Sequence, residues 1–200
     1  MDLSQHPDAL RWDKRYIEKH QAGPACLVLR ENQHLLPSQG KALDLACGLG
    51  ANALLLAQQG LDVEAWDISE VALQKLQQLA SDKNLEINCQ QHDLRRLTPK
   101  ADSFDVIVVS YFLQRETLPL LSQALKPNGL LYYQTFSRLR VDDSGPNNPE
   151  FRLDDNELLK YFPDLRLRVY REEGLNGEHE KGLRNEVMLV AQKPDAAPAK

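Results

Sequence analysis

One stretch of the chain, from Lys41 to Ser69, restricts the possible fold more than any other. It reads KALDLACGLGANALLLAQQGLDVEAWDIS, with Gly48 and Gly50 between two apolar runs. An apolar run, a glycine-containing turn, a helical pattern and a second apolar run form a strand–helix–strand unit, whose two strands lie parallel in one sheet. Glycine in the turn permits left-handed backbone and close approach by a ligand. The stretch therefore predicts an α/β sheet with a ligand site at this turn.

The same alternation of strand and helix patterns continues along the chain and predicts a mostly parallel, doubly wound sheet. After the fifth strand the pattern changes to a turn-rich loop, a short helix and two alternating runs, which predict an antiparallel pair at one edge. The predicted strands are 41–46, 62–67, 86–91, 104–110, 129–136, 165–173 and 183–193, and the predicted helices that follow the first strand are 51–59, 69–83, 115–125 and 154–162.

The length of 200 residues and a hydrophobic content of 42% favour one domain, which we expect over residues 1–193. Within it, residues 1–38 are predicted to form helices that cover the ligand site. Residues 194–200, PDAAPAK, are predicted to be a disordered tail. No apolar run is long enough to cross a bilayer and the N-terminus lacks a signal-peptide pattern, so the expectation is a cytoplasmic protein without membrane contact.

Charge and cysteine content exclude further classes. The net charge is −5 and the arginines are scattered, so no nucleic-acid interface is expected. The three cysteines, Cys26, Cys47 and Cys89, show no C-x-x-C spacing. Neither a disulfide framework nor a metal site is therefore predicted. The oligomeric state is not predicted by any feature of the sequence.

Two aspartates bear on what the glycine turn binds. Asp67, at the end of the second strand, can accept hydrogen bonds from both hydroxyls of a ribose. The turn itself, GLGANA, also satisfies the dinucleotide pattern G-x-G-x-x-A, which is weak evidence when it stands alone. Asp44 would repel a pyrophosphate but favour a ligand that carries an amine. Asp93, after the third strand, can accept from an adenine amino group, so the set favours an aminoacyl nucleoside ligand.

Taken together, these motifs resemble those of the class I S-adenosylmethionine-dependent methyltransferases over residues 10–192. The run DLACGLG is similar to the family's glycine motif, with Ala46 where the first glycine usually stands. The resemblance implies a Rossmann-like seven-stranded sheet of order 3-2-1-4-5-7-6 with strand 7 antiparallel, and S-adenosyl-L-methionine as the cofactor. The cofactor-binding residues that it implies are Arg15, Asp44, Ala46, Gly48, Gly50, Asn52, Asp67, Ile68, Asp93, Leu94 and Ser110.

A narrower resemblance is to the small TehB-type methyltransferases. It rests on WDKRY near the N-terminus, on LDVEAWDIS and on the late segment GEHEKGLRNE. In that group a His and an Arg of the final hairpin reach the acceptor, which implies His179 and Arg184 here. Tyr111 and Arg115 follow the fourth strand and are further candidates near the acceptor. The fourth strand continues as SYFLQ rather than N-P-P-Y, which favours a small-molecule acceptor over a nucleobase amine.

Several alternatives stay open on the sequence alone. The leading hypothesis is a methyltransferase acting on a small thiol, chalcogen, hydroxyl or amine, and the others are a non-catalytic S-adenosylmethionine-binding module and an NAD-dependent oxidoreductase. Asp93 is alternatively a turn cap, His179 a loop histidine and Arg184 an edge-strand charge. Trp12 and Tyr16 form one apolar face by their spacing. The functional alternative is that Arg15 or Tyr16 closes over the cofactor.

Overall fold

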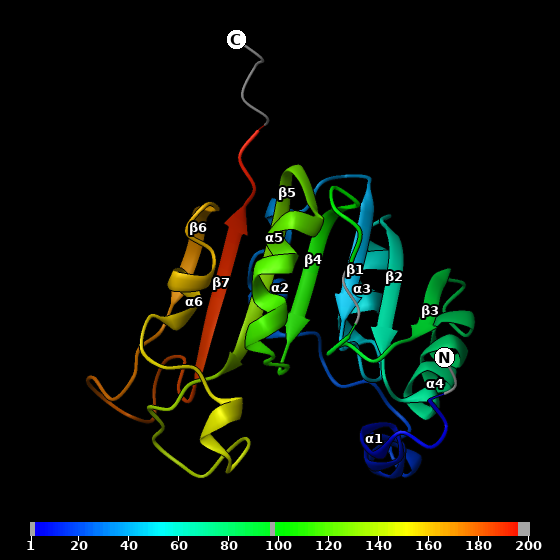
Figure 1. Cartoon of the computed structure of the whole chain (residues 1–200), viewed down its shortest axis with the longest axis horizontal. Coiled ribbons are helices and arrows are strands. Elements are labelled where there is room, and N and C mark those ends of the chain that lie inside the picture. The colour runs from blue at the N-terminus through cyan, green and yellow to red at the C-terminus, as the bar shows by residue number, and fades with distance from the viewer. Residues whose placement is uncertain (1–2, 97–98, 196–200) are drawn as a thin grey trace.

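The computed structural model describes residues 3–96 and 99–195, so most of the predicted tail lies outside the described residues. Its seven strands form one sheet of order β3-β2-β1-β4-β5-β7-β6, in which β7 runs antiparallel to both neighbours (Figure 1). This confirms the predicted fold class and strand order. The strands are β1 (Lys41–Leu45), β2 (Asp62–Asp67), β3 (Ile87–Gln91), β4 (Phe104–Ser110), β5 (Leu125–Phe136), β6 (Arg166–Arg171) and β7 (Glu186–Gln192).

Helices cover both faces of the sheet (Figure 1). The predicted helix over 115–125 divides into a 3₁₀ turn and a separate α-helix, because Pro119 has no N–H to donate and is tolerated only in a first helical turn. The helices are α1 (Pro7–Ile17), α2 (Leu27–Glu31), α3 (Ala51–Gln58), α4 (Glu70–Ser81), α5 (Leu118–Ala124) and α6 (Glu157–Tyr161), with 3₁₀ turns η1 (Gln33–Leu35), η2 (Arg115–Thr117) and η3 (Pro149–Phe151).

The central strands are apolar on both sides and divide the core into two layers. Val106 and Val108 of β4 pack in one layer with α2, α3 and α4, whereas Ile107 and Val109 pack in the other with α5 and α6. Side chains alternate across a strand, so a strand buried on both faces must be apolar throughout. This is why β4 reads FDVIVVS with a single internal charge, at the end remote from the ligand turn.

The starts of two strands differ from the sequence prediction by several residues. The fifth strand, predicted over 129–136, begins at Leu125, and β5 bulges where its pairing with β4 shifts register between Phe104 and Val106. β7 begins at Glu186 rather than 183, because Asn185 is left-handed with φ +62 and its side chain binds the 141–144 loop. The loop after β5 is thereby fixed to the start of β7.

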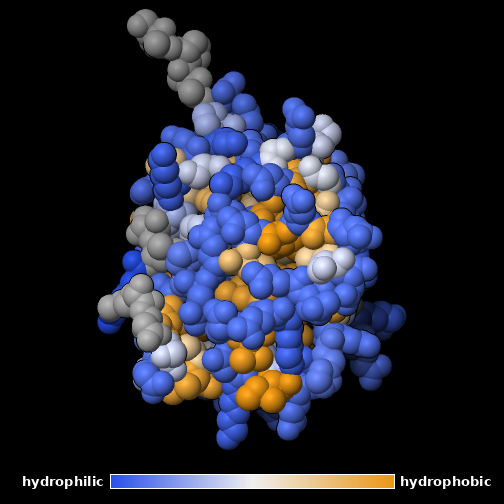
Figure 2. Space-filling model, turned by 90° about the vertical axis from the view of Figure 1, so that its right-hand side faces the viewer, coloured by the Kyte–Doolittle hydropathy of each residue, from blue (hydrophilic) through white to orange (hydrophobic). Residues whose placement is uncertain are grey.

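No helix among residues 3–96 and 99–195 has the length and apolar character that a bilayer crossing requires. Figure 2 shows the side of the molecule that carries β3 and α4 as mainly hydrophilic, with apolar side chains exposed in small areas. Two apolar residues of α1, Leu10 and Ile17, are exposed.

The glycine turn connects β1 to α3 and its geometry depends on close packing. Gly50 has φ +73, and a Cβ added there would lie 2.3 Å from Cδ1 of Leu76, a fully buried residue of α4. Gly50 therefore allows α3 to start directly against α4. The second glycine of the motif is required by packing as well as by backbone conformation.

We expect Gly50→Ala to lower the free energy of unfolding by about 1–3 kcal/mol, because the new methyl overpacks the core beside Leu76. Urea denaturation measures this change. The matched control is Gly23→Ala, since nothing lies within 4 Å of an added Cβ at Gly23, and a change below about 0.5 kcal/mol is expected there. Equal losses in the two variants would contradict the packing role of Gly50.

Candidate functional site

The candidate site lies where β1, β2 and β4 end, since parallel neighbours bring their carboxyl ends to one edge of the sheet. The turn after β1 is left-handed at Ala46, Gly48 and Gly50, with φ of +59, +54 and +73. The N–H of Cys47 donates to the carbonyl of Trp66 at 3.1 Å, which holds the turn against β2. Ala46 adopts the conformation that usually requires glycine, so the substitution in the motif keeps the shape of the turn.

Asp67 joins the turn after β1 to the turn after β2. Its carboxylate accepts from the N–H of Gly48 at 2.8 Å and from the N–H of Ser69 at 2.9 Å. The side chain is only 6% exposed, and burial raises its pKa above the usual value while the two backbone donors oppose that rise. Each carboxylate oxygen has a second lone pair, so Asp67 can still accept from a ligand.

Asp44 lies beneath the turn and is completely buried. It accepts from Nδ2 of Asn52 at 3.2 Å and from the N–H of Ala53 at 3.0 Å, and burial raises its pKa to about 7. Nδ2 of Asn52 also lies 3.0 Å from Oγ of Ser110, while Oδ1 of Asn52 accepts from the N–H of Cys26. Asn52 therefore connects Asp44 to the end of β4 and to the start of α2.

Helix α1 reaches the glycine turn through Tyr16, not through Arg15. A Cβ added at Gly48 would lie 2.6 Å from the hydroxyl oxygen of Tyr16, so that hydroxyl occupies the space above the glycine. The Arg15 guanidinium is instead 5.1 Å from the ring centroid of Trp12, and Trp12 stacks on Tyr16. Of the two residues expected to close over the cofactor, Tyr16 lies above the turn, whereas Arg15 lies on the exposed face of the helix.

Two side chains that the sequence analysis missed hold α1 in this position. Asp13 accepts from Oγ of Ser69 at 2.6 Å and from the N–H of Val71 at 3.2 Å, so it caps the start of α4. Nζ of Lys75 donates to three carbonyls at the end of α1, those of Tyr16, Ile17 and Lys19. Asp13 stands within WDKRY, but the sequence did not indicate its partner.

Helix α2, the second predicted N-terminal helix, packs against β5 and β7. Cys26, the residue before α2, contacts the site through its N–H, which donates to Oδ1 of Asn52 at 2.9 Å.

The remaining predicted residues follow β2 and β3. Ile68 is half-buried and its carbonyl accepts from Nε2 of Gln91 at 3.0 Å, whereas Leu94 is buried. Asp93 accepts from the N–H of Arg95 at 3.1 Å, which is a turn-capping arrangement. Its other carboxylate oxygen lies 3.5 Å from Nε of Arg96. The same oxygen lies 3.7 Å from Nε2 of His6. The capping alternative for Asp93 thus has a structural basis.

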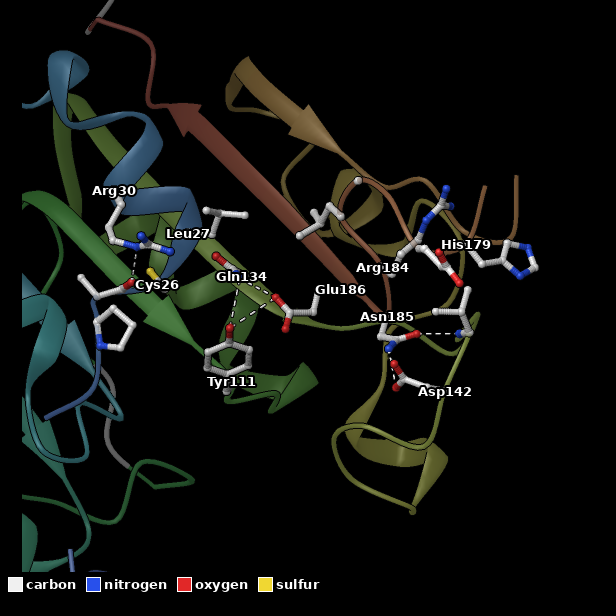
Figure 3. Close-up of a pocket in the computed structure, with 16 residues that line it drawn as sticks. Cys26, Leu27, Arg30, Tyr111, Gln134, Asp142, His179, Arg184, Asn185 and Glu186 are labelled. Carbon is white, nitrogen blue, oxygen red and sulfur yellow. Dashed lines mark hydrogen bonds between the residues drawn. The ribbon is translucent and has the colours of Figure 1, made fainter. Parts of the chain in front are cut away.

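A cavity of about 560 Å³ lies beside this site and is lined by the three residues predicted to be catalytic, Tyr111, His179 and Arg184 (Figure 3). His179 is exposed at the outer edge of the labelled group, and its Nε2 lies 2.9 Å from the carbonyl of Leu175. The Arg184 guanidinium donates to the carbonyls of Lys181, Gly174 and Glu178. In this conformation both side chains stabilise their own loop.

Arg115, the fourth residue proposed near the acceptor, does not line this cavity. Its Nε donates to Glu157 at 2.6 Å, and the same guanidinium binds the carbonyls of Glu150 and Arg152. It connects the loop after β5 to α6.

The inner wall of the cavity carries a polar cluster of which the sequence analysis identified only Tyr111. The Tyr111 hydroxyl donates to Oε2 of Glu186 at 3.3 Å, and Nε2 of Gln134 donates to the same Oε2 and to the Tyr111 hydroxyl. In Figure 3 these three side chains converge from β5, β7 and the residue after β4. Gln134 and Glu186 lie at the ends of β5 and β7 that border the cavity. The antiparallel pairing of β5 with β7 brings these two ends together.

The fold and the motif geometry agree with comparisons to known proteins. A family model described as "Tellurite resistance protein TehB" matches residues 13–189. The chain belongs to the TehB family. The crystal structure of TehB from Haemophilus influenzae superposes with a TM-score of 0.65 at 26% identity, covering 92% of this chain and 66% of that one. A SAM-dependent methyltransferase from Methanosarcina mazei, at 19% identity and TM-score 0.65, covers 87% of this chain and 100% of its own and shows the same fold.

Two curated relatives of this TehB-family chain are similar in sequence. "Putative methyltransferase YqeM" of Bacillus subtilis is 32% identical over 136 residues, which are 64% of this chain and 54% of that protein. "Probable S-adenosyl-L-methionine-dependent methyltransferase TehB" of Haemophilus influenzae is 31% identical over 138 residues, 66% of this chain and 48% of that protein. The chain spans about half the length of these relatives.

For this TehB-family chain, we expect Lys75→Met to release α1, since it removes the charged donor to three carbonyls at the end of that helix. Amide hydrogen exchange within residues 9–17 should accelerate about tenfold, as expected for the loss of a charged hydrogen bond. Lys83→Met, at an exposed lysine beyond α4, is the control and should leave exchange unchanged. Identical exchange in α1 of the wild type and Lys75→Met would contradict this role.

The buried Asp44 predicts an unusual pH dependence of stability. Its folded pKa of about 7 exceeds the unfolded value of about 3.9, so the folded state binds the extra proton between these values. Stability contributed by Asp44 is therefore lost as pH rises from about 4 to about 7, with a slope of at most about 1.4 kcal/mol per unit. The difference in unfolding free energy between wild type and Asp44→Asn, from denaturant titrations across this range, should fall with pH. A constant difference would exclude this titration.

Proposed function

We propose that this chain is an S-adenosylmethionine-dependent methyltransferase that acts on a small molecule by in-line methyl transfer. The observation that carries the proposal is the left-handed glycine turn between two buried carboxylates, Asp44 below it and Asp67 beside it. A pyrophosphate at this turn would meet both carboxylates, whereas a ligand with an amine and a ribose suits them. Membership of the TehB family supports the same assignment.

The residues around the turn fit S-adenosylmethionine, which supplies a methyl group on a sulfonium when it is bound. Asp67 would accept from the ribose hydroxyls, and Asp44 would act on the amine side through Asn52, because Asp44 itself is fully buried. Gly48 leaves the space above the turn without a Cβ. Of the remaining set, Ile68 and Leu94 would border the adenine, Asp93 its amino group, and Ser110 the region of the methyl group.

The chain's contribution to such a reaction is orientation and exclusion of water, since the sulfonium is already a good leaving group. Tyr16 above Gly48 and the Asp13 and Lys75 contacts of α1 favour a helix that closes over the ligand. Arg15 lies next to Tyr16 and in our proposal reaches the ligand only if α1 shifts. Residues 1–193 would then act as one domain, with α1 as its cover.

We assign the acceptor to the cavity lined by Tyr111, His179 and Arg184, at the carboxyl ends of β4 and β5. A volume of about 560 Å³ suits a small molecule and lies within the usual range of ligand pockets. In our proposal His179 and Arg184 form the outer side of this cavity, where carbonyls of their own loop hold both side chains.

Isothermal titration with S-adenosylmethionine, S-adenosylhomocysteine and NADH tests the proposed function. We expect the first two to bind and NADH not to bind, and we expect Asp67→Ala to weaken binding about 10- to 100-fold through loss of charged hydrogen bonds. Asp62→Ala, an exposed carboxylate at the other end of β2, is the matched control and should bind as the wild type does. Binding of NADH alone, or of none of the three, would reject the proposal.

A further inference from the structure

The cluster of Tyr111, Gln134 and Glu186 can accept a proton. Methyl transfer to an anion releases no proton and does not need such a cluster. We propose that Glu186 is the terminal proton acceptor of the acceptor cavity, reached through the Tyr111 hydroxyl. We further propose that the acceptor is an uncharged small molecule whose hydroxyl or thiol loses a proton during the reaction. This inference rests on the proposed function and specifies its substrate class.

The hydrogen bonds within the cluster define a direction for the proton. The Tyr111 hydroxyl donates to Oε2 of Glu186 at 3.3 Å and accepts from Nε2 of Gln134 at 3.1 Å. Gln134 also donates to Oε2 of Glu186, while its own Oε1 accepts from the N–H of Val28 at 2.7 Å. The amide of Gln134 is thus fixed in one orientation, and it holds Tyr111 and Glu186 together.

Tyr111 is placed to meet a molecule in the cavity. Its side chain is 48% exposed, whereas Glu186 is half-buried behind it. The backbone of Tyr111 is left-handed with φ +55, and its N–H donates to the carbonyl of Gln134 at 2.8 Å. A left-handed tyrosine is an uncommon and unfavourable conformation, which is found mostly where surrounding structure imposes it. This conformation directs the ring to the cavity and packs it on Phe136, with centroids 5.1 Å apart.

Burial makes Glu186 a better base than an ordinary carboxylate. It raises the pKa of Glu186 above the usual value, and the pKa of Tyr111 is raised by burial and then by the negative charge of Glu186. A base is most effective when its pKa approaches the working pH. The titratable groups that face Glu186 across the cavity are Tyr111, Arg30 of α2 and Cys26 before it, with Asp142, His179, Glu180 and Arg184 from the two loops.

The charges of the cavity disfavour an oxyanion. Three carboxylates line it, those of Asp142, Glu180 and Glu186, against the two guanidinium groups of Arg30 and Arg184. Arg184 is bound to three backbone carbonyls, and Nε of Arg30 donates to the carbonyl of Ala25. An anionic acceptor would therefore approach the unneutralised carboxylate of Glu186, and like charges repel. Apolar side chains in the same wall, Leu27 and Leu183 among them, suit an uncharged molecule.

The proposed step balances without a further reactant. The oxygen or sulfur of the acceptor forms a bond to the methyl carbon as the bond from that carbon to the sulfonium sulfur breaks, and its electron pair stays on that sulfur. The proton of the acceptor passes to the Tyr111 hydroxyl oxygen while the proton of Tyr111 passes to Oε2 of Glu186. The products are the methylated acceptor, S-adenosylhomocysteine and a protonated Glu186, which returns its proton to water.

The test follows S-adenosylhomocysteine formation by the full chain with three acceptor probes, phenol, 2-mercaptoethanol and selenite. We expect turnover of phenol or 2-mercaptoethanol in preference to selenite, and a loss of kcat of about 100-fold or more in Glu186→Gln near neutral pH. Both hydrogen bonds to Glu186 end on one oxygen, so the glutamine can keep them and only the charge is removed. With 2-mercaptoethanol, activity of this variant should recover at a pH above the pKa of that thiol, where thiolate forms unaided.

Tyr111→Phe should show the same recovery, and Glu178→Gln, at an exposed glutamate paired with Lys181, should match the wild type throughout. Retention of kcat within about threefold in Glu186→Gln near neutral pH, an equal loss at every pH, turnover of selenite alone, or turnover of none of the probes would overturn the inference. S-adenosylmethionine titration of the same proteins separates the two proposals. If the cofactor binds and the proton dependence is missing, only this inference fails; if it does not bind, the proposed function fails as well.

Discussion

The carboxylate of Asp67 is the interaction on which the rest of the site depends. It accepts from backbone N–H groups of both Gly48 and Ser69, so the turn after β1 and the start of α4 share one anchor. Without it, two backbone donors at the edge of the sheet would lack their partner, which costs about 1–3 kcal/mol for each buried group. Asp67 is also the residue that we propose to accept from the ligand, so in our proposal stability and ligand binding depend on one group.

Around this anchor the site is built from helix ends. Asp13 of α1 caps the start of α4, and Lys75 of α4 binds the end of α1, so each helix satisfies open backbone groups of the other. Such contacts are polar and half-buried or exposed, unlike the apolar packing of α3 against β1 and β2. A helix held in this way can be released without unfolding the core, which suits the covering role that we propose for α1.

The glycine turn and the cavity that we assign to the acceptor are joined by two buried amides. Asn52 binds Asp44, Ser110 and the N–H of Cys26, while Gln134, the strand partner of Ser110, binds Tyr111, Glu186 and the N–H of Val28. Each amide uses both its donor and its acceptor, so its orientation is fixed. Helix α2, too short to be stable alone, is positioned by these two bonds and by its packing on β5 and β7.

The strand order was implied by the resemblance to the class I methyltransferases. Periodicity of the sequence itself determined the alternation of strands and helices, the position of the glycine turn and the residues at the ends of β1, β2 and β4. These follow from apolar periodicity and from the handedness of strand–helix–strand units, which are local or nearly local properties. The predicted start of β7 was wrong, because Asn185 before this strand binds a loop more than forty residues away. Tertiary structure alone decided that Tyr16 rather than Arg15 reaches Gly48, that Lys75 holds α1, and that Gln134 and Glu186 meet Tyr111. These pairings join residues 23 to 75 positions apart, and periodicity within one element does not indicate which distant side chain will lie opposite it.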